Sequence, residues 1–263
     1  MGCVQTFAQL VRQKVENNLD SGEFLCDLQC EGLFCVQRKG GYSFTTDAVL
    51  LANFINGIKN KKIVEFCSGS GVISLLVNAK RKPREIACVE IQSKLAQMNE
   101  KSLMINAIKN VVVYNQSLEA FACEHYGNFD ACYCNPPYFK FGSGHLPKSE
   151  EASIAKYEIK TNLRSIISSA KQVLNKRGKL FLVHLTERLD EIKMELARSG
   201  FFINRIKYVY PNRRKQSNIV LIEAGQSPKK SRVLSGIIVH NLDGSETMQL
   251  QRIYNRNGEF SKK

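Results

Sequence analysis

Residues 62–71 read Lys-Ile-Val-Glu-Phe-Cys-Ser-Gly-Ser-Gly, and this stretch decides the fold that the sequence predicts. Its apolar first half, Lys62–Phe66, predicts a short buried strand, and the turn after it leads into a helical pattern over Val72–Ala79. A strand, a glycine-rich turn and a helix make the first half of a nucleotide-binding βαβ unit, in which glycines let the backbone approach a ligand closely. Gly69 and Gly71 are therefore candidate ligand-binding residues.

The second half of the unit favours a nucleoside ligand that lacks phosphates. A second apolar run predicts a strand ending at Glu90, 19 residues beyond Gly71, where a carboxylate can accept hydrogen bonds from both ribose hydroxyls. Neither a third glycine nor a Gly-Lys-Ser/Thr follows Gly71, and the acid Glu65 before the turn would repel a pyrophosphate but attract a cation. These features favour an adenosyl compound without phosphates over NAD or ATP.

Two further predicted strands, at residues 110–115 and 129–134, are each followed by polar side chains. Gln116 and Ser117 follow the first strand, where a polar group could reach an adenine ring, and Asn135 follows the second. Ligands of open parallel sheets bind outside the carboxyl ends of the strands. We therefore expect the glycine turn, the ribose-binding acid, Gln116 and Asn135 to converge on one crevice.

The tetrapeptide Asn135-Pro136-Pro137-Tyr138 has the composition of a site for an amine. The two prolines fix φ and supply carbonyls without N–H groups, so the backbone past the strand is stiff and presents acceptors. An amide oxygen, a fixed carbonyl and an aromatic face could together hold a planar molecule that carries an NH2 group. From these four residues alone, a proline-terminated loop with an Asn turn is an equal alternative.

The rest of the chain predicts an α/β domain with a small appendage. A polar run, Ser43–Asp47, precedes an apolar helical pattern and predicts a helix N-terminus that is available to a ligand. We expect the main domain at residues 1–225, and a basic linker and hairpin packed on it at residues 226–263. The other expected elements are a helix at 6–18, a strand or hairpin at 25–42 with its turn at 39–41, a mobile loop at 139–151, helices at 154–174 and 188–199, strands at 179–184, 203–210 and 218–223, and the appended hairpin at 236–260.

Basic residues are concentrated in the last third of the chain. The formal net charge is +14 with a sequence pI near 9.4, and residues 176–263 hold 18 Lys and Arg against 8 Asp and Glu. This balance favours a polyanionic partner, most simply nucleic acid, although a lysine-rich proteome would also make a protein basic. The loop Arg213–Lys215 is either a phosphate contact or a solvated strand connection. The candidate RNA-binding residues are Lys140, Arg213, Arg214, Lys215, Lys229, Lys230 and Arg232.

The nine cysteines favour reduced core thiols over disulfides or a metal site. Their number is odd, several lie in apolar runs, and none shows the paired C-x-x-C spacing of a zinc site. We expect no bound metal. The absence of an apolar run of about eighteen residues argues against a membrane span, and Met1–Asp20 is too polar for a signal peptide. We expect a cytoplasmic monomer.

Six segments, taken in order along nearly the whole chain, resemble the class I S-adenosylmethionine-dependent N-methyltransferases, and within them the bacterial tRNA1(Val) adenine-N6 methyltransferase group. These segments are Gly41–Ala52, Val64–Gly71, Glu90–Gln92, Asn135–Tyr138, Ile154–Glu158 and Val209–Pro211. Asn-Pro-Pro-Tyr alone marks only amino-group methylation and is shared with enzymes that methylate glutamine in release factors. The first segment and the basic loop after the last one narrow the resemblance to the tRNA group.

The resemblance implies a Rossmann-like, seven-stranded sheet, mostly parallel with an antiparallel strand near its C-terminal edge, and S-adenosylmethionine as the cofactor. It implies methyl transfer to the exocyclic N6 amine of an adenosine in tRNA, just 3′ of the anticodon. A protein-glutamine N5 methyltransferase and a non-catalytic RNA-binding protein on a methyltransferase frame are the alternatives. The implied catalytic residues are Asn135, Pro136, Pro137 and Tyr138, and the implied cofactor-binding residues are Phe44, Thr45, Thr46, Asp47, Glu65, Cys67, Gly69, Gly71, Glu90, Ile91, Gln116, Ser117 and Asn135.

Three positions depart from the family pattern. Cys67 replaces the first loop glycine, so the backbone must tolerate a side chain there. Glu65 replaces the usual Asp, which keeps the charge but lengthens the side chain. Gln116 or Ser117 stands where an acid usually follows the third strand, and Gln116 could still form a hydrogen bond with adenine.

Overall fold

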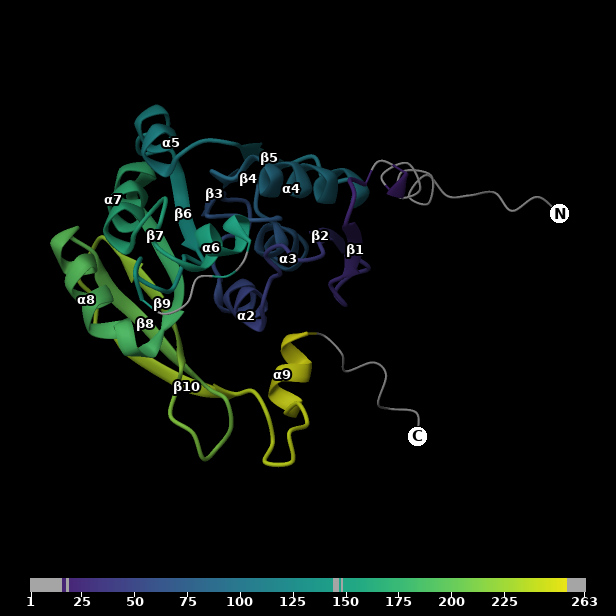
Figure 1. Cartoon of the computed structure of the whole chain (residues 1–263). Coiled ribbons are helices and arrows are strands. Elements are labelled where there is room, and N and C mark those ends of the chain that lie inside the picture. Colours follow the sequence, from purple (N-terminus) through teal and green to yellow (C-terminus); the bar gives the residue numbers. More distant parts are fainter. Residues whose placement is uncertain (1–15, 18, 144–146, 148, 255–263) are drawn as a thin grey trace.

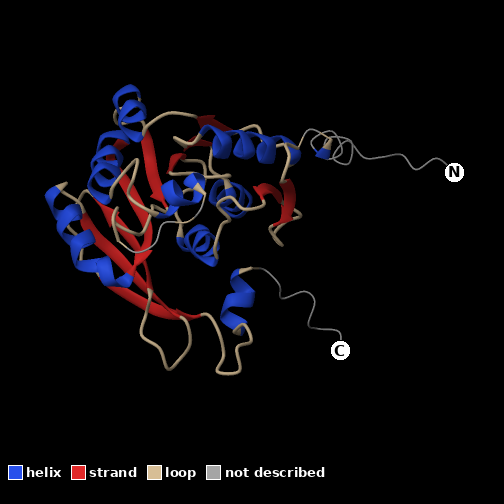
Figure 2. Cartoon of the chain, viewed as in Figure 1, coloured by secondary structure: helices blue, strands red, loops and turns tan. Residues whose placement is uncertain are grey.

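An eight-stranded sheet with the strand order β10-β8-β9-β7-β6-β3-β4-β5 forms the centre of the molecule (Figures 1 and 2). The computed structural model describes residues 16–17, 19–143, 147 and 149–254. The strands of the sheet are β3 (Lys62–Phe66), β4 (Glu85–Val89), β5 (Val111–Tyr114), β6 (Phe129–Cys134), β7 (Leu174–Leu185), β8 (Phe202–Tyr210), β9 (Ile219–Gly225) and β10 (Arg232–Ile238). Within the described residues, no helix has the length and apolar composition needed to cross a membrane.

All strand pairs of this sheet are parallel except the two that β9 makes. β9 is antiparallel to both β7 and β8, and β10 pairs with β8 in parallel. The predicted Rossmann-like α/β fold, with an antiparallel strand near the C-terminal edge, is therefore confirmed. The helices are α2 (Thr46–Phe54), α3 (Val72–Arg81), α4 (Ser93–Ile105), α5 (Leu118–Glu124), α6 (Glu150–Lys156), α7 (Leu163–Val173), α8 (Leu189–Arg198) and α9 (Met248–Ile253).

The C-terminal appendage differs from the predicted hairpin. β10 takes the free edge of β8 as an eighth strand, and α9 follows where the second arm of a hairpin was expected. An unpaired sheet edge offers backbone donors and acceptors to any extended segment, and a pattern of alternating residues does not show which edge it will pair with. Thr247 begins α9, since its side chain accepts a hydrogen bond from Leu250 N at 3.2 Å. The division of the chain at residues 225 and 226 stays a prediction.

Two other predicted elements have different boundaries. β1 (Glu23–Asp27) and β2 (Phe34–Arg38) pair as a hairpin whose turn spans residues 28–33. The predicted turn at 39–41 is present, but it follows β2 and does not join the two strands. The single helix predicted over 154–174 is two helices, α6 and α7, because Asn162 and Ser165 form a capping box that begins a new helix. The helix predicted at 6–18 lies mostly outside the described residues, as does part of the loop predicted at 139–151.

Two buried clusters hold helices against the two faces of the sheet. One cluster packs α2 and α3 against one face, and the other packs α5, α7 and α8 against the opposite face (Figure 1). The parallel strands are therefore covered on both sides, as their continuous apolar runs require. Because helices cover both faces of the sheet, a ligand would approach it at the ends of its strands.

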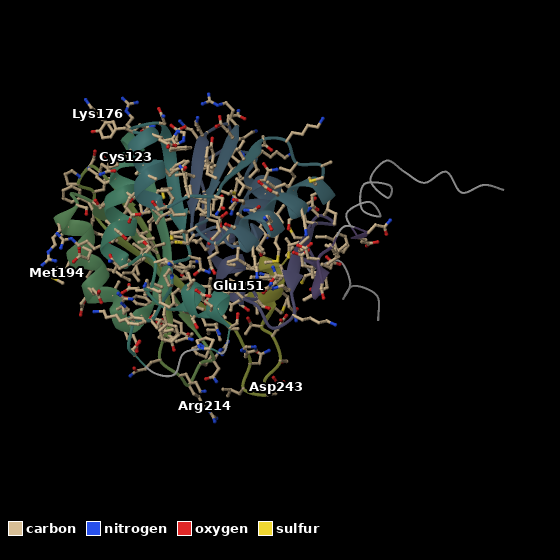
Figure 3. All side chains as sticks on the ribbon, turned by 45° about the horizontal axis from the view of Figure 1, so that its top comes forward. Cys123, Glu151, Lys176, Met194, Arg214 and Asp243 are labelled. Carbon is tan, nitrogen blue, oxygen red and sulfur yellow. The ribbon has the colours of Figure 1, made fainter. Side chains whose placement is uncertain are left out.

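The side of the sheet at which most strands end, the carboxyl edge, differs chemically from the side at which they begin, the amino edge. The carboxyl edge, where β3, β4, β5, β6 and β8 end, carries the glycine turn, Asn135 and the loop Arg213–Lys215. The amino edge, where the same strands begin, carries Lys176, which lies near the start of β7, the strand that pairs with β6. Figure 3 shows Lys176 and Arg214 at opposite ends of the molecule.

Candidate active site

A cavity opens at the carboxyl edge of the sheet. The lining combines residues from the ends of β3, β4, β5 and β6, which confirms the predicted crevice. The lining residues are Tyr42, Cys67, Gly69, Val89, Glu90, Ile91, Gln92, Leu95, Gln116, Leu118, Asn135, Pro137, Ile154, Ala155, Lys160 and Thr161.

Glu90 is held rigidly beside the glycine turn. Its Oε2 accepts a hydrogen bond from Gly69 N at 2.8 Å, and its Oε1 accepts one from Gln92 N at 2.9 Å. Burial raises the pKa of this carboxyl, while these backbone donors favour the charged form. Each carboxylate oxygen keeps a further lone pair, so Glu90 can still accept hydrogen bonds from the hydroxyls of a ribose.

The turn has positive φ angles at Cys67, Gly69 and Gly71. Cys67 has φ = 54°, in the left-handed region that L-residues with a side chain rarely adopt. Gly71 has φ = 83°, and a Cβ there would lie 2.1 Å from Asn99 Oδ1, so a glycine is required. Gly71 begins α3 but is not among the residues that line the cavity, and its role in this structure is to make the turn.

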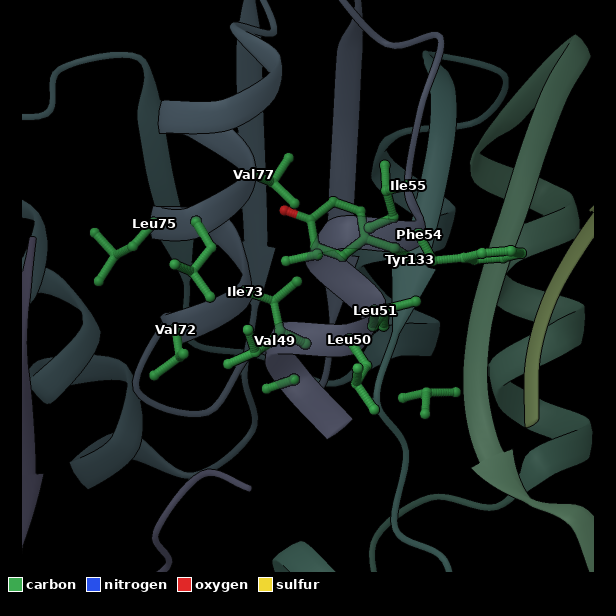
Figure 4. Close-up of a cluster of buried hydrophobic side chains, with 14 of the residues drawn as sticks. Val49, Leu50, Leu51, Phe54, Ile55, Val72, Ile73, Leu75, Val77 and Tyr133 are labelled. Atoms are coloured by element: carbon green, nitrogen blue, oxygen red, sulfur yellow. The ribbon is translucent and has the colours of Figure 1, made fainter. Parts of the chain in front are cut away.

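Glu65 lies beneath the site and not on its surface. Its side chain is buried and accepts a hydrogen bond from Ser74 Oγ, which also contacts the Tyr133 hydroxyl at 2.7 Å. Burial raises the pKa of Glu65 to about 8. Tyr133 comes from β6, and Figure 4 shows its ring among side chains of α2 and α3. Glu65 is absent from the cavity lining, so the expectation that its charge faces a cationic ligand is not met in this structure.

The segment Phe44–Asp47 supports the tetrapeptide, and its neighbour Tyr42 lines the cavity. Asp47 Oδ2 accepts hydrogen bonds from the Tyr138 hydroxyl at 3.1 Å and from Thr45 Oγ1 at 3.2 Å. Burial raises the pKa of Asp47. Phe44, Thr45, Thr46 and Asp47, predicted to bind the cofactor, are not among the lining residues that the structure describes.

Ser117 was also expected at the cofactor but has a structural role. Its hydroxyl caps α5 by accepting a hydrogen bond from Ala120 N at 3.2 Å. Gln116 does line the cavity, and its amide also contacts Glu124 at 3.3 Å. The polar end of β5 therefore presents one side chain to the cavity and uses the other to begin a helix.

Tyr138 is fixed on three sides. Its ring packs against the buried His184 with the ring centroids 5.1 Å apart, its hydroxyl donates to Asp47, and its carbonyl accepts a hydrogen bond from Arg188 Nη1 at 2.9 Å. Burial lowers the pKa of His184 to about 3, so the imidazole against the tyrosine is neutral at pH 7. One face of the tyrosine ring is thus covered by another ring.

Arg188 connects the tetrapeptide to two acids. Its guanidinium forms ion pairs with Glu158 at 2.8 Å and Glu191 at 2.9 Å, and Glu158 Oε1 also accepts a hydrogen bond from Leu163 N. Arg188 was not predicted as a site residue, since an isolated arginine before a helix carries no local signal. Lys160, which lines the cavity, was not predicted either, because the helix predicted over 154–174 included it.

Residues 36–198 match the family described as the methyltransferase small domain. The chain belongs to this family. The predicted methyltransferase activity is thereby confirmed, together with S-adenosylmethionine as the cofactor. The match includes the glycine turn, Glu90 and Asn135–Tyr138, which are the parts of the site that the sequence predicted.

Two curated relatives of this methyltransferase carry the same name. A "tRNA1(Val) (adenine(37)-N6)-methyltransferase" from Vibrio campbellii is 22% identical over 208 residues, covering 78% of this chain and 84% of the relative. A protein of the same name from Histophilus somni is 28% identical over 226 residues, covering 82% and 84%.

Solved structures share the fold. A predicted O-methyltransferase from Agrobacterium tumefaciens aligns with a TM-score of 0.63 at 17% identity, covering 80% of this chain and 95% of that one. The M. jannaschii protein TYW2, solved in complex with AdoMet, aligns with a TM-score of 0.54 at 10% identity, covering 80% and 89%.

The cavity of this methyltransferase has the chemistry of an adenosyl site. Glu90 offers acceptors for ribose hydroxyls, and the Gly69 backbone approaches without a side chain. Ile91, 41% exposed although apolar, and Leu118 present hydrocarbon to the same cavity, which suits the faces of a purine ring. These residues could hold the nucleoside part of S-adenosylmethionine, and Asn135 lines the same cavity.

The candidate RNA-binding residues of the methyltransferase fall into two groups. Lys140, which pairs with Glu191 at 3.1 Å, and the loop Arg213–Lys215 follow β6 and β8 at the carboxyl edge, the edge of the cavity. Lys229, Lys230 and Arg232 follow β9, which runs in the opposite direction, and they lie at the amino edge. The structure therefore separates residues that the sequence placed in one set.

Proposed function

We propose that this methyltransferase transfers a methyl group from S-adenosylmethionine to the N6 amine of an adenosine in tRNA, at the nucleotide just 3′ of the anticodon. The observation that carries the proposal is the position of Asn135, at the end of β6 and in the lining of the cavity, followed by two prolines and a fixed tyrosine. Bound S-adenosylmethionine supplies an electrophilic sulfonium methyl group.

Asn135 and Pro136 would act on the amine of the base. An exocyclic amine of adenine is a poor nucleophile because its lone pair is delocalised into the ring. If the Asn135 amide oxygen and the Pro136 carbonyl each accept one N–H, the nitrogen is drawn toward tetrahedral geometry and its lone pair becomes available. The fixed φ of the two prolines holds these acceptors still, and no strong base is required.

Tyr138 would hold the plane of the base. Its ring is fixed by His184 on one face and by Asp47 at the hydroxyl, so stacking of a base on the other face would cost little side-chain freedom. Stacking of a base on an aromatic side chain contributes about 1–3 kcal/mol. The target adenosine would leave its neighbours in the RNA to reach this position.

Two features support tRNA over a protein substrate. The last third of the chain holds most of the net positive charge, which a polyanion requires and a glutamine side chain does not. The curated relatives from Vibrio campbellii and Histophilus somni are named as tRNA methyltransferases. Methylation of glutamine in a release factor would use the same cavity and serves as the competing substrate in the test.

The test separates methyl transfer from cofactor binding. Labelled methyl transfer to bulk tRNA and to release factor is measured for the wild type, for Asn135→Ala, and for the control Asn128→Ala, an exposed asparagine at the other end of the same strand. We expect Asn135→Ala to abolish transfer to tRNA while calorimetry shows nearly unchanged binding of S-adenosylmethionine. Equal loss of transfer and binding would contradict the role of Asn135, and transfer to release factor but not to tRNA would contradict the proposed substrate.

A further inference from the structure

Three adjoining hollows make a basic surface at the amino edge of the sheet, which we call the amino-edge surface. The first hollow shares Lys179, Asn204 and Lys229 with the second, and the second shares Lys176, Arg177 and Lys179 with the third, so the three form one continuous region. Two carboxylates, Asp130 and Glu223, line it. Eight cations line it: Lys61, Lys176, Arg177, Lys179, Arg205, Lys229, Lys230 and Arg232.

Both carboxylates are already neutralised by part of this set. Asp130 pairs with Lys61 at 3.5 Å, and Glu223 pairs with Lys179 at 3.0 Å and with Arg205. Arg205 is further fixed by Asn56 Oδ1 at 3.0 Å and by the ring of Phe54 at 4.9 Å. The two acids therefore fix Lys61, Lys179 and Arg205 in place, and the other cations of the surface remain available to a ligand.

Five of the cations have no carboxylate partner in the described part of the chain, and all five are exposed: Lys176, Arg177, Lys229, Lys230 and Arg232. Exposed lysines and arginines spread over adjoining hollows suit a run of phosphates.

The amino-edge surface is separate from the methyl-transfer site. β6 carries Asp130 near its first residue and Asn135 directly after its last, and its six residues at about 3.3 Å each put about 20 Å of sheet between the two edges. An RNA that reaches both edges must therefore extend well beyond the loop that holds the methylated base. Figure 3 shows Lys176 of the amino-edge surface at the opposite end of the molecule from Arg214, which follows β8 at the carboxyl edge.

We propose that the amino-edge surface binds the sugar-phosphate backbone of the tRNA in a segment outside the anticodon stem-loop. This inference rests on the proposed function, since it takes tRNA as the substrate. The contacts position the RNA through charge and carry no sequence information, because they come from lysines and arginines directed at a backbone. The surface adds affinity for the whole tRNA that an isolated stem-loop cannot use.

The test compares two double variants that remove the same charge. Lys229→Ala/Lys230→Ala changes the amino-edge surface in a segment outside any helix or strand, and Lys193→Ala/Arg198→Ala changes exposed residues of α8. Fluorescence anisotropy measures Kd for labelled full-length tRNA and for the isolated anticodon stem-loop over a range of salt concentrations. We expect the first variant to raise the Kd for full-length tRNA roughly tenfold at about 0.1 M salt and to reduce the salt slope by about 1.5, since each phosphate contact contributes about 0.7–0.9.

The Kd for the isolated anticodon stem-loop shows which part of the RNA the amino-edge surface contacts. We expect Lys229→Ala/Lys230→Ala to leave stem-loop affinity equal to that of the α8 control. An unchanged salt slope with full-length tRNA would overturn the proposal, and so would an equal loss for both RNAs, because the surface would then contact the stem-loop itself. Failure of the proposed function is a separate result, seen when the wild type transfers no methyl group to tRNA whatever its affinity.

Discussion

The buried pair Arg188–Glu158 should stabilise the site far more than an exposed pair of the same chemistry. Arg188 is 9% exposed and Glu158 is 10% exposed, and their side chains meet at 2.8 Å. Removing one partner of a buried pair leaves an uncompensated charge, which typically costs about 3–5 kcal/mol of the free energy of unfolding. The pair Lys193–Asp190, at 2.9 Å but 49% and 94% exposed, should contribute about 0.2–1 kcal/mol.

A double-mutant cycle measures this difference directly. Arg188→Met, Glu158→Gln and the double variant are compared by urea unfolding with the corresponding cycle for Lys193 and Asp190. We expect Arg188→Met alone to lower the free energy of unfolding by about 3–5 kcal/mol, and Glu158→Gln to cost less, since Arg188 keeps Glu191. The double variant should recover part of the loss, because it no longer buries a lone carboxylate.

The activity of the same variants tests the link to Tyr138. Arg188 donates to the Tyr138 carbonyl, so we expect Arg188→Met to lower kcat for methyl transfer at temperatures where the variant stays folded, with little change in the KM for S-adenosylmethionine. Glu158→Gln, which keeps the guanidinium, should retain more activity. A coupling free energy for Arg188–Glu158 no larger than that for Lys193–Asp190 would refute the reasoning.

Two further predictions concern the strand and turn before α3. Burial raises the pKa of Glu65 to about 8 from its ordinary value near 4.5. Between these pH values the Glu65 carboxyl is ionised in the unfolded chain but protonated in the folded protein. The free energy of unfolding therefore falls as pH rises, by up to about 1.4 kcal/mol per pH unit. Glu65→Gln should therefore raise Tm more at pH 8 than at pH 5, and an equal change at both pH values would contradict the burial of an acid. Because Cys67 has φ = 54°, the protein should be stabilised by about 1 kcal/mol in Cys67→Gly and destabilised in Cys67→Val, as urea midpoints will show. A glycine variant less stable than wild type would mean that side-chain packing outweighs the strain.

The main parts of the fold and cavity follow from short patterns. The strand and glycine turn at Lys62–Gly71, the acid Glu90 and the tetrapeptide Asn135–Tyr138 are each local signals. Parallel strands end at one edge, so the strand ends predict a shared cavity without any knowledge of distant contacts. The structure bears this out for Gly69, Glu90, Gln116 and Asn135.

Residues that act through distant contacts were not predictable in the same way. Arg188 lies 50 residues beyond the Tyr138 carbonyl that it holds, and Glu65 turns out to be buried against Ser74 and Tyr133. Local sequence shows that a side chain is charged but not whether its environment is water or a packed interior. Tertiary packing alone decides that, because burial sets both the partner and the pKa.

By itself, the sequence determined the class of fold and the convergence of Gly69, Glu90, Gln116 and Asn135 on one cavity. Only the tertiary structure decided which basic residues lie near that cavity. Arg213–Lys215 and Lys229–Arg232 are close in the chain, yet the antiparallel β9 lies between them and carries the second group to the amino edge. The physical reason is that the direction of a strand, set by parallel or antiparallel pairing, decides at which edge of the sheet the next residues lie. The distribution of charge along the chain does not predict that direction.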